Sequence, residues 1–360
     1  ATQWQNLTLL AVVSIGGIWL LSFLLVAVNV TVTAAVLPGV PGRERLAFVG
    51  AAIVLIGLGF ASSLAQPDTN PSGSFAVAGV QPGVVEGGAA RINAQEELTR
   101  TLVDQDLDLV VWAESSVAVE LEPGSERLER LQALSSEVGA PLLVNVDSRR
   151  ESGGIYKATV LIGPDGIEDR YDKMRLVPFG EYVPIRPLFG WITSLTDAAE
   201  EDRRRGESLV VMDVDGVAIG PLVCFESAFP DLSRHLADRG AEVIVLQTAT
   251  TTFQGGWAQP QHASLAAVRA VETSRPVVHA ALSGVSAVFE ADGTRLTELG
   301  SSEIGTWQAA PRLSTGTTIY VRTGDWVPLI SLLILLVGVA IILPRPRQRS
   351  TDRALVDSEG

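Results

Sequence analysis

Three residues of this chain, Glu114, Lys173 and Cys224, have the types needed for chemistry on an acyl carbon. Cys224 is the only cysteine, which excludes a disulfide within the chain and leaves its thiol as a candidate nucleophile. A free thiol has a pKa of about 8.5, and a nearby carboxylate can take its proton as the sulfur attacks. An ammonium group can then stabilise the oxyanion of the tetrahedral intermediate.

Each of the three also has an ordinary interpretation. A lone cysteine is most often a small buried hydrophobe, and a lone glutamate or lysine is most often a solvated surface group. The surrounding sequence favours chemistry, because Glu114 and Cys224 each end a strongly apolar run and Lys173 lies between them in a loop rich in proline and glycine. Ligands bind at the carboxyl ends of strands in open α/β sheets. We therefore expect Glu114 and Cys224 to face one crevice.

The elements that must position these residues are short apolar strands alternating with amphipathic helices. Strands are expected at residues 75–80, 107–112, 141–146 and 242–247. Helices are expected at residues 94–104, 125–138, 230–239 and 262–273. Hairpins with glycine-containing turns are expected at residues 158–171, 209–223 and 286–299. This mixture indicates an α/β domain with a mixed sheet over residues 75–310.

Three long uncharged stretches lie outside this domain, and each is expected to form a transmembrane helix. They cover residues 7–30, 46–66 and 326–343. A buried core helix is the alternative for the second stretch. Residues 67–74 are rich in proline, glycine and serine and are expected to form a linker, and residues 344–360 are expected to form a disordered tail.

Arginine residues set the expected orientation in the membrane. Arg43 and Arg45 lie between the first two stretches, and four arginines follow the third. Positively charged flanks stay in the cytoplasm, so the tail is expected there and the 75–310 domain is expected outside. The chain opens on alanine without a positively charged leader. We therefore expect a fragment that lacks earlier transmembrane helices, and no signal peptide.

The sequences around the three residues resemble those of a known family. Trp-Ala-Glu-Ser-Ser contains Glu114, Tyr-Asp-Lys-Met-Arg-Leu-Val-Pro-Phe-Gly-Glu-Tyr-Val-Pro contains Lys173, and Cys-Phe-Glu begins at Cys224. These motifs, 59 and then 51 positions apart, are similar to the Glu-Lys-Cys signatures of the nitrilase, or carbon-nitrogen hydrolase, superfamily. The Pro-Phe-Gly-Glu-Tyr-Val-Pro run and the flanking apolar stretches resemble more narrowly the apolipoprotein N-acyltransferase family. The resemblance implies a nitrilase-like αββα sandwich flanked by transmembrane α-helices.

The resemblance also implies a two-step reaction that needs no metal or organic cofactor. Cys224 would take a fatty acyl chain from a membrane phospholipid as a thioester. The α-amino group of the N-terminal diacylglyceryl-cysteine of an apolipoprotein would then accept that chain. Glu114 would act as the base and Lys173 would hold the oxyanion. The protein would lie in the lipid bilayer of a bacterial plasma membrane, with its catalytic domain on the extracytoplasmic side.

By the same match, three further residues are expected to support the site. Glu181 would orient Lys173 or Glu114 by contacting them on the side away from the substrate. Glu226 comes two positions after the nucleophile in the sequence. The amide of Phe225 would add a second donor to the oxyanion. Ordinary solvation in a loop is the alternative for the two supporting glutamates.

Two other functions are compatible with the same residues. One is a membrane-tethered nitrilase-type amidase that hydrolyses C–N bonds with water as the second nucleophile. The other is a catalytically silent scaffold, against which the complete Glu-Lys-Cys set argues. Apolar stretches at both ends favour a lipid substrate. The net charge of −14, without a basic stripe, argues against nucleic acid as a partner.

Three features carry weaker expectations. Residues 247–255 read Gln-Thr-Ala-Thr-Thr-Thr-Phe-Gln-Gly, where members of the family often carry an Asn-Asp-Ala-Trp-Phe-like stretch, so contacts to the acyl chain or headgroup there are in doubt. The apolar residues 183–195 are expected either to pack on the domain or to form a mobile lid over the acyl site. His262 opens an expected helix, and a structural role is favoured over contact with substrate.

Overall fold

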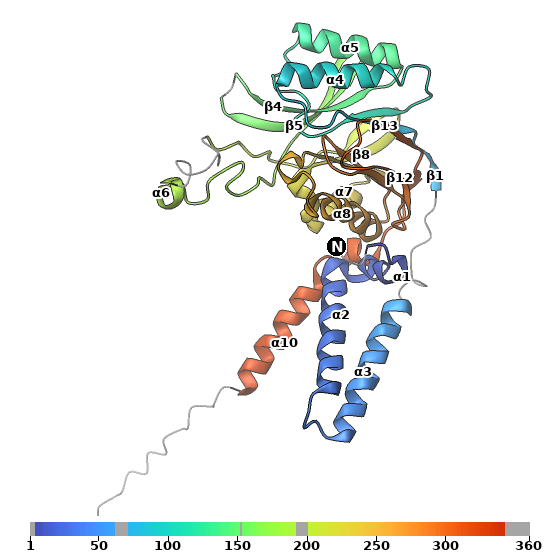
Figure 1. Ribbon diagram of the computed structural model, residues 1–360, viewed down its shortest axis with the longest axis vertical. Coiled ribbons are helices and arrows are strands. Elements are labelled where there is room, and N and C mark those ends of the chain that lie inside the picture. The colour runs from blue at the N-terminus through green and yellow to red at the C-terminus, as the bar shows by residue number, and fades with distance from the viewer. Residues whose placement is uncertain (1–3, 62–70, 152, 192–200, 343–360) are drawn as a thin grey trace, which may run out of the picture.

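The computed structural model describes residues 4–61, 71–151, 153–191 and 201–342. Within these residues, two six-stranded sheets lie face to face between two layers of helices (Figure 1). The first sheet contains, in spatial order, β13 (Gly305–Ala309), β2 (Val77–Gln81), β3 (Leu109–Trp112), β4 (Leu142–Arg149), β5 (Ile155–Gly163) and β6 (Gly166–Asp172). The second contains β12 (Arg295–Leu299), β11 (Ser286–Phe289), β10 (Val277–Ala281), β9 (Val243–Thr248), β8 (Val217–Val223) and β7 (Met212–Val214).

Helices cover the outer face of each sheet. The first sheet carries α4 (Gly88–Arg100) and α5 (Glu126–Val138), and the second carries α7 (Pro230–Asp238) and α8 (Ala258–Thr273) (Figure 1). Strand β3 illustrates why both faces are apolar. Successive side chains of a strand point to opposite sides, so Leu109 and Val111 join the core between the sheets, whereas Val110 and Trp112 pack with residues of α4 and α5. The result is an αββα sandwich, as expected.

The two halves of the sandwich repeat one order of elements. The first half runs β2-α4-β3-α5-β4-β5-β6, and the second runs β8-α7-β9-α8-β10-β11-β12. In each half the three leading strands are parallel and the last two add as antiparallel hairpins. The carboxyl ends of β3, β8 and β9 therefore lie at equivalent edges, which meet where the two sheets face each other.

The three expected hairpins are confirmed as β5–β6, β7–β8 and β11–β12. The helix expected at 94–104 instead begins at Gly88 and ends at Arg100. Gly88 is the first residue of the helix, and its ideal Cβ would lie only 2.9 Å from that of Ala118, so this close packing requires glycine.

The borders of the domain also differ from the expectation. Part of the expected linker forms β1 (Pro71–Ser74), which pairs antiparallel with β14 (Arg312–Ser314). The domain therefore extends past residue 310, through β14 and α9 (Ile319–Thr323). Residues 67–70 and the tail at 344–360 lie outside the described residues.

The apolar stretch expected to be one span at 7–30 is not a single helix. It forms α1 (Leu7–Leu10), a short helix at the base of the domain, followed by α2 (Val13–Val36). Helix α2 is itself broken, because Gly16 and Gly17 have non-helical backbone angles, with φ of +65° and ψ of −171° at Gly17. Such angles are open essentially to glycine alone.

Helix α2 and helix α3 (Gly42–Ala61) form an antiparallel pair that projects from the domain (Figure 1). Among the described residues, these two helices are long and apolar enough to cross a membrane. Helix α10 (Trp326–Ile342) is shorter, with 17 residues, and leaves the same side of the domain (Figure 1). The second expected span, at 46–66, begins four residues earlier than expected, at Gly42, and its last residues lie outside the described ones.

Candidate active site

Glu114 lies two residues past the end of β3 and is buried. Its Oε1 atom accepts hydrogen bonds from the ammonium groups of Lys157, at 2.8 Å, and Lys173, at 3.3 Å. Its Oε2 atom accepts a hydrogen bond of 2.9 Å from the amide of Ala249, just past the end of β9. Strand ends from both sheets thus fix this one carboxylate.

Lys173 directly follows β6, and no part of its side chain is exposed to solvent. Its Nζ atom donates to Glu181, at 2.8 Å, as well as to Glu114. The backbone amide of Lys173 donates to the carbonyl of Lys157, at 2.8 Å, and its carbonyl accepts from the amide of Gly206, at 2.9 Å. The lysine therefore stands in an ordered segment.

Cys224 directly follows β8 and begins a short 3-10 helix, Cys224–Ala228. Its φ angle is +49°, a left-handed conformation that is unusual for a residue with a side chain. Strain of this kind is concentrated at functional sites, where the surrounding structure holds it. The residue is partly exposed, and its thiol interacts with the Glu114 carboxylate and the Lys173 ammonium group. The structure thus brings Glu114, Lys173 and Cys224 together.

The electrostatics of the site keep Glu114 ionised and Cys224 protonated at rest. Burial opposes the charge of Glu114, but Lys157 and Lys173 outweigh it and hold the pKa of this carboxyl at about 2. Burial and the charge of Glu114 raise the pKa of the Cys224 thiol to about 12, although both lysines oppose the rise. Burial also opposes the charge of Lys173, but its carboxylate neighbours keep the pKa of that ammonium above its ordinary value. A carboxylate beside a neutral thiol is the arrangement required for general-base activation.

Glu181 lies in the Pro-Phe-Gly-Glu turn that follows Lys173. Its Oε2 atom accepts a hydrogen bond from the amide of Val177, at 2.8 Å, which folds the turn back on itself. Its Oε1 atom lies 2.8 Å from Nζ of Lys173 and 3.4 Å from Nζ of Lys157. Glu181 was expected to orient either Lys173 or Glu114, and in the structure it contacts Lys173.

Glu226 lies behind the site. It is completely buried and accepts hydrogen bonds from Tyr171, Met174, Arg175 and Val223, at distances between 2.8 and 3.0 Å. These donors flank both Lys173 and Cys224, so Glu226 ties the two segments together.

Phe225 points its ring at Phe229, with ring centroids 5.0 Å apart in an edge-to-face arrangement. The role expected for the amide of Phe225 as an oxyanion donor stays a prediction.

Lys157, on β5, was missed by the sequence reasoning. Beyond its hydrogen bond to Glu114, its Nζ atom lies 3.2 Å from Oγ of Ser115 and 3.6 Å from Asp147. Composition contains a signal that could have found it. Lys157 and Lys173 are the only two lysines in the sequence, against 25 arginines, and both contact the same carboxylate.

His262 and His279 form a pair behind the turn that carries Cys224. Nδ1 of His262 lies 3.1 Å from Nε2 of His279, whose own Nδ1 lies 2.9 Å from the carbonyl oxygen of Val285. The Nε2 atom of His262 lies 3.5 Å from Oγ of Ser227. These contacts agree with the structural role that was favoured for His262. Among the described residues, no group of three or more His, Cys, Asp or Glu side chains could hold a metal ion.

The segment at 247–255 contributes to the site through its backbone and one amide side chain. Gln247 donates to the carbonyls of Trp112 and Leu143, at 2.6 and 3.0 Å, and so joins the two sheets. Ala249 supplies the amide that holds Glu114. Since the hydrogen bond from Ala249 is a main-chain one, the departure from the family pattern leaves this contact intact.

The apolar segment expected at 183–195 is described as far as Trp191, and residues 192–195 lie outside the described ones. It contains one helical turn, α6 (Arg186–Phe189), which projects to the side of the sandwich (Figure 1). Ile185, Leu188 and Trp191 are all more than half exposed. An exposed arm of this kind differs from a loop packed on the domain, but closure over the site stays a prediction.

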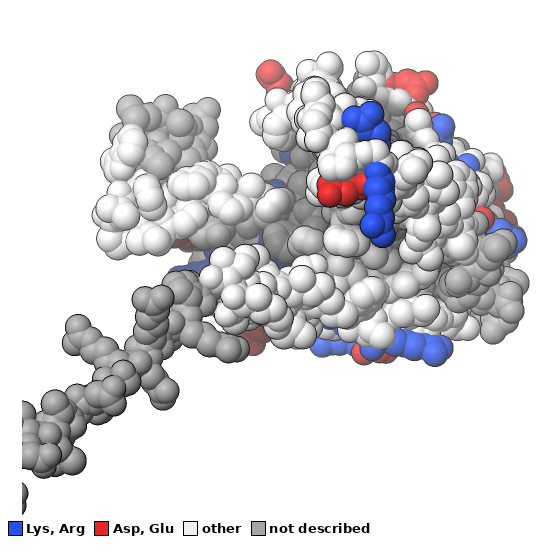
Figure 2. Space-filling model, turned by 90° about the horizontal axis from the view of Figure 1, so that it is seen from below, with Lys and Arg blue, Asp and Glu red and all other residues white. Residues whose placement is uncertain are grey.

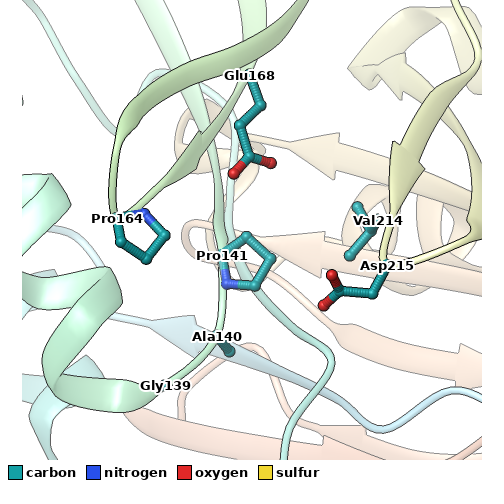
Figure 3. A pocket seen from close by; sticks show the side chains of 7 residues that line it. All are labelled: Gly139, Ala140, Pro141, Pro164, Glu168, Val214 and Asp215. Atoms are coloured by element: carbon teal, nitrogen blue, oxygen red, sulfur yellow. The ribbon is translucent and has the colours of Figure 1, made fainter.

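A separate cavity of about 240 Å³ lies at the opposite ends of the strands. Glu168 and Asp215 face it, together with Pro141 and Pro164 (Figure 3). Pro141 and Asp215 lie at the amino ends of β4 and β8, whereas Glu114 and Cys224 lie past the carboxyl ends of β3 and β8. This cavity therefore shares no residue with the Cys224 site.

Known proteins resemble this chain in sequence and in fold. A family model described as carbon-nitrogen hydrolase matches residues 76–320. The apolipoprotein N-acyltransferase of Pseudomonas syringae is 28% identical to this chain, and the match covers 92% of the chain and 67% of the relative. That of Geobacter metallireducens is 29% identical, and the match covers 90% of the chain and 65% of the relative. The chain thus spans about two thirds of the length of these curated relatives.

Solved structures match the fold. The nitrilase-superfamily protein Nit3 of Saccharomyces cerevisiae aligns with a TM-score of 0.53 at 18% identity, over 77% of this chain and 98% of its own. An amidase from Nesterenkonia aligns with a TM-score of 0.53 at 19% identity, over 74% of this chain and 98% of its own. At such identities the likeness concerns the sandwich alone.

Proposed function

The chain belongs to the carbon-nitrogen hydrolase family, and we propose that it transfers a fatty acyl chain from a membrane phospholipid to the α-amino group of an apolipoprotein's N-terminal diacylglyceryl-cysteine. Cys224 is the nucleophile, Glu114 the base and Lys173 the oxyanion donor in this proposal. One observation carries it: a thiol, a carboxylate and an ammonium group converge in a domain from which apolar helices project on one side.

The projecting helices support a lipid substrate. Most of their large apolar side chains are exposed, which is costly in water and favourable in a bilayer. Seen from below, along these helices, most of the surface is uncharged (Figure 2). Trp19 and Trp326 lie where α2 and α10 meet the domain, as aromatic residues do at membrane interfaces, and Arg43 and Arg45 lie near the far end of the helical pair. This distribution favours a bilayer crossed by the helices with the domain on one side.

In the first step, the sulfur of Cys224 attacks the ester carbonyl of the phospholipid while its proton passes to Glu114. The oxyanion of the tetrahedral intermediate is held by the ammonium group of Lys173. The carbon–oxygen ester bond then breaks, and the leaving oxygen takes the proton from Glu114. The products are a thioester on Cys224 and a lysophospholipid, and Glu114 is ionised again.

In the second step, the free amine of the acceptor attacks the thioester carbonyl and gives a proton to Glu114. The carbon–sulfur bond breaks, an amide forms, and the thiol of Cys224 recovers the proton. Each step leaves the charges of Glu114 and Lys173 unchanged, so the two half-reactions can use one site in turn.

The test is the mass of the Cys224 peptide after incubation of the full chain with micelles of phosphatidylethanolamine. We expect an acyl thioester that hydroxylamine removes, and its transfer to a synthetic diacylglyceryl-cysteine peptide. Cys224→Ala should abolish both. Hydrolysis of small amides by an enzyme that takes no acyl chain from phospholipid would instead identify the membrane-tethered amidase, and the proposal would be wrong.

A further inference from the structure

The two lysines of this chain and two carboxylates form a closed ring of alternating charge. Starting at Lys157, the ring passes through Glu114, Lys173 and Glu181 and returns to Lys157. Its four nitrogen-to-oxygen distances are, in that order, 2.8, 3.3, 2.8 and 3.4 Å. One oxygen of each carboxylate thus lies between both ammonium groups. Ring members on opposite sides carry like charges, which is tolerated because each has two opposite charges as neighbours.

Strand pairing explains why Lys157 meets this ring. β5 and β6 are antiparallel neighbours, and the amide of Lys173 donates to the carbonyl of Lys157 just past the end of β6. The two side chains therefore start from adjacent backbone positions and reach Glu114 together. Only 11% of the Lys157 side chain is exposed, so its charge is largely shielded from water.

The composition of the chain adds an independent observation. All 25 other positively charged side chains are arginine. The two residue types differ, since lysine offers a compact ammonium with three donors on a flexible stem, whereas arginine offers a rigid planar fork. A compact donor can fill a corner between two carboxylates that are themselves held by other groups. Lysine occurs in this chain only where such a corner exists.

We propose that Lys157 is a positioning residue of the reaction, which fixes the Glu114 carboxylate and neutralises the second negative charge of the ring. The proposal rests on the thiol chemistry proposed for Cys224. Without Lys157, Lys173 would supply the only ammonium contact to the two carboxylates, because Arg203 acts on them from farther away and pairs with Asp147. The oxyanion of the intermediate would then form beside a net negative charge, which is unfavourable in a shielded site.

Lys157 also decides the pH range in which Glu114 can act as base. Glu114 must be ionised to accept the thiol proton, and both lysines hold its pKa at about 2 against burial. Removing one of them raises the pKa of Glu114, because burial then has less opposition. The base is consequently lost as pH falls through a higher value, and the acid limb of the rate profile moves upward.

The experiment compares the rate of thioester formation on Cys224 in the wild-type full chain and in Lys157→Met. The pH is varied between about 4 and 8, the range between the ordinary pKa values of a carboxyl group and a thiol. We expect the wild-type rate to show no acid limb from Glu114 in this range. The Lys157→Met rate should fall on the acid side and be lower throughout, by about 10- to 100-fold. Lys157→Arg keeps the charge and should keep the wild-type pH profile. Arg130→Met, which removes a partner of buried Glu96 on the outer helices, should change neither.

Two acyl donors separate this proposal from the proposed function. Phosphatidylethanolamine micelles report acyl transfer from lipid, and p-nitrophenyl acetate acylates the thiol without a membrane. If wild-type protein forms no thioester from the lipid, the proposed function is wrong. The pH profiles of wild-type protein and Lys157→Met can still be compared with the ester as acyl donor. If a folded Lys157→Met variant has the wild-type rate and profile with the ester, Lys157 is not a positioning residue.

A measurement on folded protein without a change at Lys157 provides a second test. Lysine labelled with ¹³C at Cε gives signals from two side chains only, both in the site. We expect Glu114→Gln to shift both signals, because both ammonium groups contact its carboxylate. The signal lost in Lys157→Arg identifies Lys157, and if that signal does not shift in Glu114→Gln, Lys157 is outside the ring and the proposal is overturned.

Discussion

The carboxylate of Glu272 accepts a hydrogen bond of 2.6 Å from the amide of Ile18. Glu272 lies near the end of α8, and Ile18 is the first residue after the break in α2. The first amides of a helix lack partners within the helix, so this carboxylate caps the projecting part of α2 at its positive end. Near its other end, α8 carries His262, which contacts the turn of Cys224. One helix therefore touches both the candidate site and the projecting helix α2.

The break in α2 depends on Gly17. A Cβ atom at this position would lie 2.7 Å from the Tyr320 ring, and the backbone angles there exclude other residues. Gly17→Ala is therefore expected to lower the free energy of unfolding by about 2–4 kcal/mol, through strain and overpacking. Thermal unfolding in detergent micelles measures this loss.

The matched control for Gly17 is Gly50→Ala in α3. A Cβ at Gly50 would meet nothing within 4 Å, and its helical position accepts alanine. We expect a change within about 0.5 kcal/mol for this variant. Equal stabilities for the two variants would contradict the role assigned to Gly17.

Glu226 provides a prediction about how the site is held together. Its carboxylate accepts three backbone amides and the hydroxyl of Tyr171. In Glu226→Gln, an NH₂ group would replace one acceptor and face donors. We expect a loss of about 2–3 kcal/mol in the free energy of unfolding and slower thioester formation on Cys224. Tyr171→Phe removes one donor only and should cost about 1 kcal/mol. Urea unfolding ranks the two variants, and a Glu226 variant as stable as the Tyr171 variant would refute the role of Glu226.

The convergence of Glu114 and Cys224 could be predicted because each follows an apolar strand, whereas Lys173 follows the mostly polar β6 and only its motif predicted its place in the site. An apolar run of four to seven residues identifies β3 and β8, and ligands bind at the carboxyl ends of strands in α/β sheets. The hairpins were predictable for a similar local reason, since glycine-containing turns occur between them.

Lys157 and the break in α2 depend on contacts between distant segments, and local patterns do not encode such contacts. Lys157 stands near the start of β5, where one charged side chain is ordinary until the fold places Glu114 beside it. Gly16 and Gly17 lie in a continuous apolar stretch that satisfies every criterion for a single span. Only the docking of Glu272 and Tyr320 from the far half of the chain makes the break favourable.

Glu114→Gln separates the charge of Glu114 from its role in proton transfer. Burial and Glu114 raise the pKa of the Cys224 thiol to about 12, and Lys173 and Lys157 oppose that rise. Without the carboxylate, the lysines remain and the pKa of the thiol falls, so more thiolate is present at neutral pH. Alkylation by iodoacetamide should then become faster, by about tenfold for each unit of pKa. Thioester formation from phospholipid should slow by about 100-fold or more, because no group delivers a proton to the leaving oxygen.

Both rates are measured on the same preparation, by the mass of the Cys224 peptide over time. Glu120→Gln serves as the control, since Glu120 pairs with Arg170 away from the thiol and its loss should alter neither rate. Opposite changes in the two rates require a group that both repels the thiolate and carries its proton, which is the role assigned to Glu114. A parallel fall in both rates would mean that Glu114 only shapes the pocket, and the base would have to be sought elsewhere.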